Sequence, residues 1–517
     1  MWTILWYSAM ISAVCTHFYG SKAKYIIYNR NERKGETMAK QKRSKWKIIA
    51  GIILIIQIIV SAVTIGFAAW VNVLPDKYLL LAGLILLWLV CMVYILFYCG
   101  GKKKKSKKRR YIKRSIGCVI AALIIAAGSY GSYMLAEAGL ALNRITDKDI
   151  VTDTVSVYVL KDNPAKTVMD AKDSVFAITE NYDYEHTKNA IESINEEVGK
   201  EIQTQTYDNV FAMIDALYSG DVDAMILNEA YVDIIGAQKG YEDFSDKTKT
   251  LFAHEEEKVV EEKPQTKEKS ITTDPFVIYV SGSDTRNLKL ATSRSDVNIL
   301  VVVNPQTKQV LLVNTPRDYY VQTSVSGQMR DKLTHCGIYG INCSMETLGT
   351  LYDEPVDYYV QINFSGFETL VDAIGGITIE AEKSFRTSEG GFYITQGTNQ
   401  LNGAQALAYA RERKSFADGD NARGRHQMQA ISAIIAKVSS GTTILNNYSG
   451  IMDSMEGMFS TSMSASDISA LVKMQLDDMA QWNVKSFAVS GTGSSQVTYS
   501  MPTKRSYVMY PDEDQIN

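Results

Sequence analysis

Aspartate and arginine residues at the ends of three apolar segments are the residues best suited to chemistry in this sequence. FVIYV, residues 276–280, is followed by Asp284 and Arg286. Arg294 and Asp296 come directly before VNILVVV, and Arg317 follows QVLLVN in the segment NTPRDYY. Strand ends in an open α/β sheet form the ligand crevice, so these acids and arginines are expected to converge there.

A later segment, ALAYARERKSFADGDNARGRHQMQ, carries a second polar group. Its members are Arg411, Arg413, Asp420, Arg423, Arg425 and Gln427. Guanidinium groups fit phosphate oxygens bidentately, and several of them around one crevice indicate an anion with more than one phosphate. Paired aspartates suit Mg²⁺, or Mn²⁺, bridging those phosphates. Each residue alone is better explained by a turn or a solvated salt bridge, and it is their co-occurrence that predicts a pyrophosphate–metal site.

Two α/β domains are predicted, and the second of them contains these residues. The continuous apolar strands of residues 273–498 indicate a sheet that is covered on both faces. Residues 150–252 alternate between apolar segments and helical patterns, which predicts a small accessory α/β domain. The charged stretch 253–272 is expected to be a linker, and residues 499–517 a flexible tail.

Three apolar stretches within residues 38–138 are long enough to cross a membrane. They cover residues 48–71, 78–98 and 116–135, each close to the ~20 residues that a bilayer requires. Core helices of a soluble protein are seldom apolar on every face over such a length. Met38 resembles a natural start, so residues 1–37 are predicted to be a non-native or poorly ordered extension; a signal-like segment is the alternative.

The charge is divided unevenly along the chain. Residues 1–138 carry 21 Lys/Arg against 4 Asp/Glu, and the remainder carries 33 against 53. By the positive-inside rule, the N-terminus and the basic loop KKKKSKKRRYIKR, residues 102–114, are expected to be cytoplasmic. The basic loop is also expected to contact anionic lipid. Everything after about residue 136 would then face outward. The acidic outer part makes nucleic acid an unsuitable partner.

Cys336 and Cys343 are the two cysteines of the predicted outer part. A disulfide between them is chemically allowed outside the cell. On one continuous helix they would lie roughly 10 Å apart, too far for a bridge. The sequence leaves both possibilities open.

Several ordered motifs between Asp274 and Val438 resemble the LytR–CpsA–Psr proteins. They are SGSDTR, SRSDVNILVVVNPQTKQVLLVNTPRDYYV, DKLTHCGIYG, VDYYVQINFSGFETLVDAIGGITI, LNGAQALAYARERK and GDNARGRHQ. The last motif, the three spans and the extra domain are most similar to the capsule-type CpsA branch. His426 stands where other branches usually have an arginine, with Arg425 beside it as a substitute charge.

The resemblance implies a catalytic domain of α/β/α layers with a mixed central sheet. It implies that Asp284 and Asp296 hold Mg²⁺, and that an apolar tunnel takes the tail of a polyprenyl carrier. The residues implied to grip the pyrophosphate are Arg294, Arg317, Arg411, Arg413 and Gln427, with Arg286, Arg423 and Arg425 as further phosphate ligands. Asp420 is a candidate general base, and an equally good candidate for orienting Arg423.

The implied activity is a phosphotransfer at the outer face of a bacterial cytoplasmic membrane. A capsular or teichoic-acid-like glycan would pass from a polyprenyl-pyrophosphate carrier to peptidoglycan, with the bilayer and the capsule synthesis and export machinery as further partners. Two alternatives remain at this stage. One is a non-enzymatic regulator of polysaccharide synthesis, which leaves the acid–arginine crevice unexplained. The other is a hydrolase of the same lipid, which the residues alone do not separate from a transferase.

Overall fold

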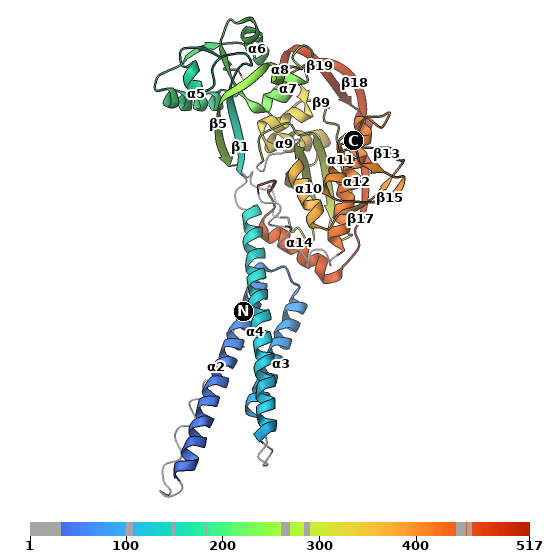
Figure 1. The fold of residues 1–517 in the computed structure, drawn as a ribbon. Helices are drawn as coiled ribbons and strands as arrows, with labels where there is room; N and C mark the ends of the chain where they lie inside the picture. Colours follow the sequence, from blue (N-terminus) through green and yellow to red (C-terminus); the bar gives the residue numbers. More distant parts are fainter. Residues whose placement is uncertain are drawn as a thin grey trace. The chain divides into compact units, whose positions relative to one another are not determined.

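The computed structural model describes residues 33–99, 107–146, 150–181, 183–259, 269–283, 290–440, 451 and 457–516. The chain divides into two compact units, Met1–Leu140 and Ala141–Asn517. Figure 1 labels their helices and strands. The two units are described separately below.

The first unit contains the three helices that the apolar stretches predict. They are α2 (Arg33–Val71), α3 (Asp76–Tyr98) and α4 (Lys107–Thr146). The segments Lys45–Val71, Asp76–Tyr98 and Arg110–Arg144 are each long and apolar enough to cross a membrane. The hydroxyls of Thr64 and Ser132 lie 2.9 Å apart and join α2 to α4. Residues 1–32 and residues 102–106 of the basic loop fall outside the described residues, whereas residues 107–114 of that loop form the start of α4.

The accessory domain is built on a five-stranded mixed sheet with the order β3-β2-β4-β1-β5. Its strands are β1 (Ile150–Leu160), β2 (Val175–Ile178), β3 (Gln203–Thr206), β4 (Ala224–Asn228) and β5 (Thr248–Val259). Its helices are η1 (Val168–Ala171), α5 (Tyr184–Val198), α6 (Val210–Ser219), η2 (Glu229–Tyr231), α7 (Val232–Gly236) and α8 (Phe244–Lys247). The side chain of Asn209 caps α6 by accepting from the Ala212 amide, and α6 buries Phe211, Met213 and Ile214 against the sheet.

The predicted linker begins too early. Residues 253–259 belong to β5, which pairs with β1 along its whole length, from Leu160↔Thr248 to Ile150↔Val259. Alternating charged residues such as Glu255 and Glu257 are exposed on this edge strand, which is why the segment resembles a solvated linker in sequence. Residues 260–268 of the predicted linker fall outside the described residues.

The domain predicted to be catalytic contains a six-stranded mixed sheet with the order β16-β11-β6-β7-β8-β17. The strands are β6 (Phe276–Ser283), β7 (Val297–Asn304), β8 (Gln309–Asn314), β11 (Tyr358–Asn363), β16 (Phe459–Thr461) and β17 (Asn483–Ala488). β11 is parallel to β6 and β17 is parallel to β8, whereas β7 runs antiparallel to both its neighbours. The predicted mixed α/β class is therefore confirmed.

Helices cover both faces of this sheet, as the continuous apolar strands predict. On one face Tyr279 and Leu300 pack against η3 (Leu333–Tyr339) and α9 (Ile341–Tyr352). On the other face Val301 and Leu312 pack against α12 (Asp420–Ser439) and α14 (Ala465–Asp478). The remaining elements are β9 (Tyr320–Val321), β10 (Asp331–Lys332), α10 (Phe364–Ala373), β12 (Ile377–Ala381), β13 (Phe385–Arg386), β14 (Tyr393–Ile394), β15 (Gly397–Leu401), α11 (Gly403–Arg411) and α15 (Glu513–Ile516).

The prediction that residues 499–517 form a flexible tail is wrong. β19 (Met501–Pro511) pairs antiparallel with β18 (Gly491–Thr498) in a hairpin, and Val508 is fully buried. The backbone of Met509 also donates to the carbonyl of Asp318, at 2.7 Å, so the hairpin is joined to the segment after β8. Strand pairing and packing hold this segment, although its side chains alternate with no long apolar run.

Cys336 and Cys343 do not share one continuous helix. Cys336 lies in η3 and Cys343 lies in α9. Gly340, whose backbone φ angle is 95°, separates these two helices. Both cysteines are buried and free, and their thiols contact each other.

Candidate functional site

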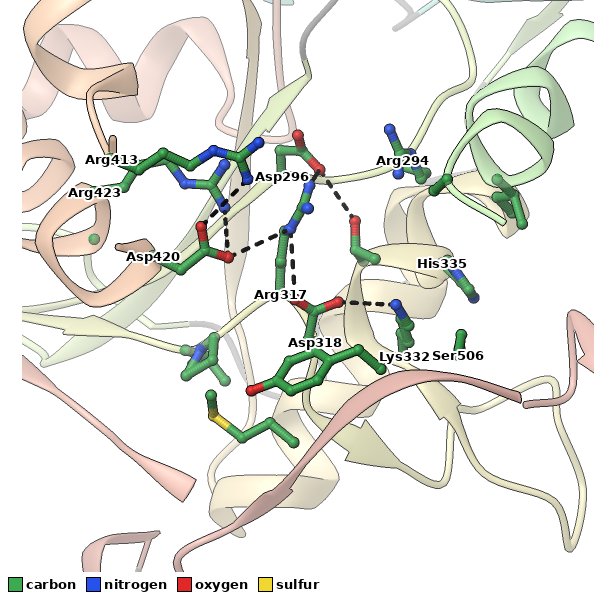
Figure 2. A pocket seen from close by; sticks show the side chains of 18 of the residues that line it. Arg294, Asp296, Arg317, Asp318, Lys332, His335, Arg413, Asp420, Arg423 and Ser506 are labelled. Atoms are coloured by element: carbon green, nitrogen blue, oxygen red, sulfur yellow. Dashed lines mark hydrogen bonds and ion pairs between the residues drawn. The ribbon is translucent and has the colours of Figure 1, made fainter. Parts of the chain in front are cut away.

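A polar cavity of about 690 Å³ lies at the sheet edge where β6 and β8 end and β7 begins. Figure 2 shows the charged side chains that converge in it. Its charged lining residues are Lys239, Arg294, Asp296, Arg317, Asp318, Lys332, Arg413, Asp418, Asp420, Arg423 and Arg505. Cations outnumber acids in this lining, so the cavity favours an anionic ligand.

Strand register brings Asp296 and Arg317 together. Gly282 pairs with Val297 and Ile299 pairs with Asn314, so the start of β7 and the end of β8 lie at one edge. The amide of Asp296 also donates to the carbonyl of Gly282, at 2.9 Å. A guanidinium Nη1 of Arg317 then donates to Oδ1 of Asp296, again at 2.9 Å.

The carboxylate of Asp296 is kept ionised by the arginines around it. Burial alone would raise its pKa, but Arg317, Arg294 and Arg423 together hold the pKa below the ordinary value. Thr334 Oγ1 donates to the same carboxylate at 3.4 Å. A buried anion of this kind keeps the neighbouring guanidinium groups in place before any ligand binds.

Asp420 connects three guanidinium groups at the start of α12. Its carboxylate lies 3.3 Å from Arg423, 3.6 Å from Arg413 and 3.9 Å from Arg317. Asp420, Arg423 and Gln427 recur at helical spacing on one face of α12, which places all three at the cavity. The geometry agrees with the orienting role considered for Asp420, and its 40% exposed side chain also leaves it accessible to a substrate.

Two guanidinium N–H groups in the cavity are buried without a hydrogen-bond partner among the residues that the structure describes. They are Nε of Arg294 and Nε of Arg317. An unmade hydrogen bond on a buried charged donor is costly, so these donors favour a ligand with acceptor oxygens. Phosphate oxygens have the geometry and the charge that such donors require.

A second cavity, of about 190 Å³, is almost entirely apolar. Its apolar lining residues are Val280, Val297, Val360, Ile362, Phe364, Phe367, Leu370, Leu407, Ala410, Ala430, Ile431, Ile434, Ile435 and Phe459. Gln427 lines this cavity and the polar one, so the two spaces meet at its side chain. A polar cavity next to an apolar one suits an amphipathic ligand with a charged head.

The predicted site residues do not all lie in the polar cavity. Arg411 lines the apolar cavity, where it pairs with Glu389 and lies 4.0 Å from the ring centroid of Phe364. Arg425 lines neither cavity; it pairs with Asp418, which lines the polar cavity, and, at 3.4 Å, with Glu382. Asp284 and Arg286 fall outside the described residues.

His426 is not a phosphate ligand in this structure. Its buried ring packs against Tyr409, Phe385 and Phe416, with the nearest centroid, that of Tyr409, at 4.4 Å. Burial lowers its pKa to about 4, so the ring is neutral near pH 7. His426 therefore does not supply the charge of the arginine expected there.

Several residues that line the polar cavity were not predicted from the sequence. Asp318 and Lys332 form an ion pair of 3.1 Å, and Asp318 lies 3.7 Å from Nε of Arg317. Asp318 stands directly after Arg317 in NTPRDYY and could have been found there. Arg505 and Tyr507 come from the hairpin that was predicted to be a tail, and four further lining residues come from the accessory domain.

The chain matches the model of the LytR_cpsA_psr family over residues 237–514, more than half of its length. The chain belongs to this family. The match begins near the end of the accessory domain and includes the catalytic domain and the C-terminal hairpin. The family resemblance predicted from the sequence motifs is thus confirmed.

Two relatives of this family member carry names that state an activity. The polyisoprenyl-teichoic acid–peptidoglycan teichoic acid transferase TagU of Enterococcus faecalis (strain ATCC 700802 / V583) is 34% identical over 226 residues, which cover 43% of this chain and 72% of that protein. The transferase TagT of Bacillus subtilis (strain 168), named for the same activity, is 36% identical over 204 residues, 38% of this chain and 62% of TagT. The match therefore leaves more than a third of TagT uncovered.

Solved structures of related proteins were also found. "TagT bound to LI-WTA" is 28% identical, with a TM-score of 0.40 over 49% of this chain and 90% of that chain. The crystal structure of B. subtilis TagV is 26% identical, with a TM-score of 0.40 over 47% of this chain and 93% of that chain.

Proposed function

We propose that this chain is a membrane-anchored transferase that moves a glycan polymer from a polyprenyl-pyrophosphate carrier to peptidoglycan. The observation that carries the proposal is the junction of the two cavities at Gln427, with arginines on one side and an apolar space on the other. A lipid pyrophosphate has a head and a tail that match these spaces. The activity named for the relatives TagU and TagT supports the same reaction class.

The proposed reaction is a phosphoryl transfer. A hydroxyl oxygen of peptidoglycan attacks the phosphorus that carries the sugar, and a new O–P bond forms. The bridging P–O bond of the pyrophosphate breaks, and polyprenyl phosphate leaves with the electron pair. Arg317, Arg413 and Arg423 neutralise the charge that develops on the phosphate oxygens, which is the main way an enzyme accelerates such a step.

The proton of the acceptor hydroxyl requires a base. We assign this role to Asp420, because its carboxylate lies in the cavity, beside the arginines that would hold the phosphates, and is accessible. Its contacts with three guanidinium groups mean that its removal would also disturb their positions. The pH profile described in the Discussion separates these two effects.

A Mg²⁺ or Mn²⁺ ion is part of the proposal. Mg²⁺ in phosphate sites is usually held by one or two carboxylates together with substrate phosphates. Asp296 is an ionised carboxylate in the cavity and fits this requirement, with Asp284 as a second ligand from the sequence pattern. When bound, the ion would neutralise phosphate charge. Among the residues that the structure describes, no group of three or more His, Cys, Asp or Glu side chains forms a metal cage by itself.

The orientation and the polymer are finer parts of the proposal. The basic residues 102–114 support a cytoplasmic loop, and hence an outer catalytic domain that meets both the carrier lipid and the wall. The names of the relatives support a teichoic-acid-like polymer, and the resemblance to the CpsA branch supports a capsular polysaccharide. The capsule synthesis and export machinery would then be a further partner. Parallel assays with both donors decide between the two polymers.

The test uses the full-length chain in detergent with a labelled polyprenyl-pyrophosphate glycan and Mg²⁺, with and without peptidoglycan. Transfer predicts label in insoluble peptidoglycan and released polyprenyl phosphate. Label released only as free phosphoglycan would support a hydrolase instead, and an unconsumed donor would support the regulator.

A cellular experiment adds an independent result. Arg411→Ala and Asp284→Ala are each expected to abolish wall attachment of the glycan while the protein stays folded in the membrane. Lys172→Ala is the matched control, because Lys172 is an exposed lysine of the accessory domain that is not part of the cavity lining. Normal wall attachment in both site variants would contradict the proposed enzyme.

A further inference from the structure

The accessory domain forms one wall of the polar cavity. Its lining residues are Ile234, Ala237, Gln238 and Lys239, from α7 and the turn that follows it. The backbone of this turn is fixed, because the amide of Ala237 donates to the carbonyl of Asp233 at 3.1 Å and the amide of Gln238 donates to that of Ile235 at 3.0 Å. The side chains that face the cavity therefore start from a defined backbone.

Packing holds this wall against the catalytic domain. Ile338 and Met501 of the catalytic domain are buried in the same apolar cluster as the helices of the accessory domain. The ammonium of Lys504, in β19, lies 3.8 Å from the ring centroid of Tyr241, three residues after the cavity-lining Gln238. A wall anchored in this way contributes to the cavity before a ligand arrives, so it can select the ligand.

An ion pair connects the wall to the phosphate-binding arginines. Nη2 of Arg294 lies 3.3 Å from the carboxylate of Asp233, in α7. The side chain of Arg294 is only 13% exposed, and its Nε makes no hydrogen bond within the described part of the chain. Asp233 thus orients this guanidinium group and leaves one of its donors for a ligand.

The position of the wall indicates which part of the donor it meets. In Figure 2, Arg413 and Arg423 lie on one side of Arg317, and Arg294 lies on the other side beside a helix of the accessory domain. Gln427, where the apolar cavity joins, belongs to α12 together with Arg423. A donor with its tail in the apolar cavity and its pyrophosphate among the arginines would have its sugars across the cavity from α12.

We infer that Gln238 and Lys239 form a subsite for the sugars bonded to the donor pyrophosphate. The amide of Gln238 can donate to and accept from sugar hydroxyls, and the ammonium of Lys239 can donate to them. The exposed Ala237 provides apolar surface for the C–H face of a sugar ring. The inference rests on the proposed function and adds a role for the accessory domain in choosing the glycan.

The test measures the binding of two lipids to the full-length chain in detergent. One is polyprenyl pyrophosphate without a sugar, and the other carries a short glycan on the same lipid. Gln238→Ala and Lys239→Ala are each expected to weaken binding of the glycan-bearing lipid about threefold to tenfold, the effect of one lost hydrogen bond, with no change for the sugar-free lipid. Single substitutions are preferred to removal of the domain, because its removal would expose Ile338 and Met501.

Two control variants define the outcomes. Arg317→Ala should weaken binding of both lipids, and Lys172→Ala should change neither. Equal effects of the Gln238 and Lys239 variants on both lipids, or no effect on either, would overturn the sugar subsite while the proposed function stands. Failure of the unaltered chain to bind either lipid would overturn the proposed function as well.

Discussion

Arg317 donates a hydrogen bond of 2.9 Å to Asp296, joining residues that follow one strand and precede its antiparallel neighbour. This bond uses one guanidinium nitrogen and leaves the buried Nε of Arg317 without a hydrogen bond in the described structure. The carboxylates of Asp296, Asp318 and Asp420 outweigh the effect of burial and raise the pKa of Arg317 above its ordinary value. The group is therefore a fixed positive charge that lines the polar cavity.

Arg317→Lys is expected to lower the rate of glycan transfer by roughly 100-fold or more, the usual loss when a preorganised charge donor is removed. Lysine keeps the charge but cannot donate to Asp296 and to a phosphate with the same planar geometry. The rate is measured with labelled donor and peptidoglycan. Arg386→Lys serves as the control, because this exposed arginine donates to the carbonyl of Gly391 at 2.7 Å and does not line the cavity. Equal rates for the Arg317 variant and the control would contradict the assigned role.

The apolar cavity can be tested by filling it. Ile434 lines this cavity and is half-buried on α12. Ile434→Trp is expected to lower transfer from a long-chain polyprenyl donor at least tenfold, because the larger ring occupies space that the tail requires. A donor with a short, water-soluble chain should be used at nearly the same rate as by the unaltered protein. Ile434→Leu is the volume-matched control, and an equal loss for long and short donors would exclude a tail-binding role.

The site edge was predictable from sequence because apolar strands are easy to recognise and their ends carry the polar residues. Asp296 and Arg317 stand beside β7 and β8, and antiparallel pairing brings those positions to one edge. Helix periodicity, applied more strictly, would also have separated Arg425 from Arg423. Positions 420, 423 and 427 share a face of α12, whereas position 425 points elsewhere and pairs with Asp418.

The C-terminal hairpin and the accessory wall of the cavity could not be predicted from the sequence, because both depend on tertiary contacts. Residues 501–511 have exposed side chains at alternate positions and only a short apolar run at 507–510, so their pattern did not distinguish a strand from a tail. Their order comes from pairing with β18 and from contact with the segment after Arg317. The accessory wall was unpredictable for the same reason, since no local pattern reports that Asp233 pairs with Arg294 across a domain contact.

The variant Asp420→Asn tests whether Asp420 acts as the general base or only orients Arg413 and Arg423. If Asp420 takes the proton of the acceptor hydroxyl, the variant should lose roughly 100-fold or more in kcat, and the fall in rate at low pH should disappear. The measurement is a pH profile of kcat for the variant and the unaltered chain. A raised KM with the low-pH limb of kcat unchanged would instead assign Asp420 to orienting Arg413 and Arg423. Asp418→Asn is a useful comparison, because Asp418 also lines the cavity but pairs with Arg425.

His426 should make the catalytic domain sensitive to acid. Burial lowers its pKa from the ordinary 6.5 to about 4, so between these values the unfolded chain binds a proton that the folded chain does not. Stability is therefore lost as the pH falls through this window, by roughly 3 kcal/mol at about 1.4 kcal/mol per pKa unit. His426→Phe keeps an aromatic ring among Phe385, Tyr409 and Phe416 and removes the proton site.

The measurement for His426 is the thermal unfolding midpoint of the full-length chain in detergent, followed from pH 7 to pH 4. The midpoint should fall with decreasing pH in the unaltered chain and fall clearly less in His426→Phe. Other carboxylates, such as Asp296 with its lowered pKa, destabilise both proteins equally on acidification, because their protonation also favours the unfolded state. The difference between the two curves therefore reports His426 alone, and parallel curves would show that its ring is protonated in the folded protein as readily as in the unfolded chain.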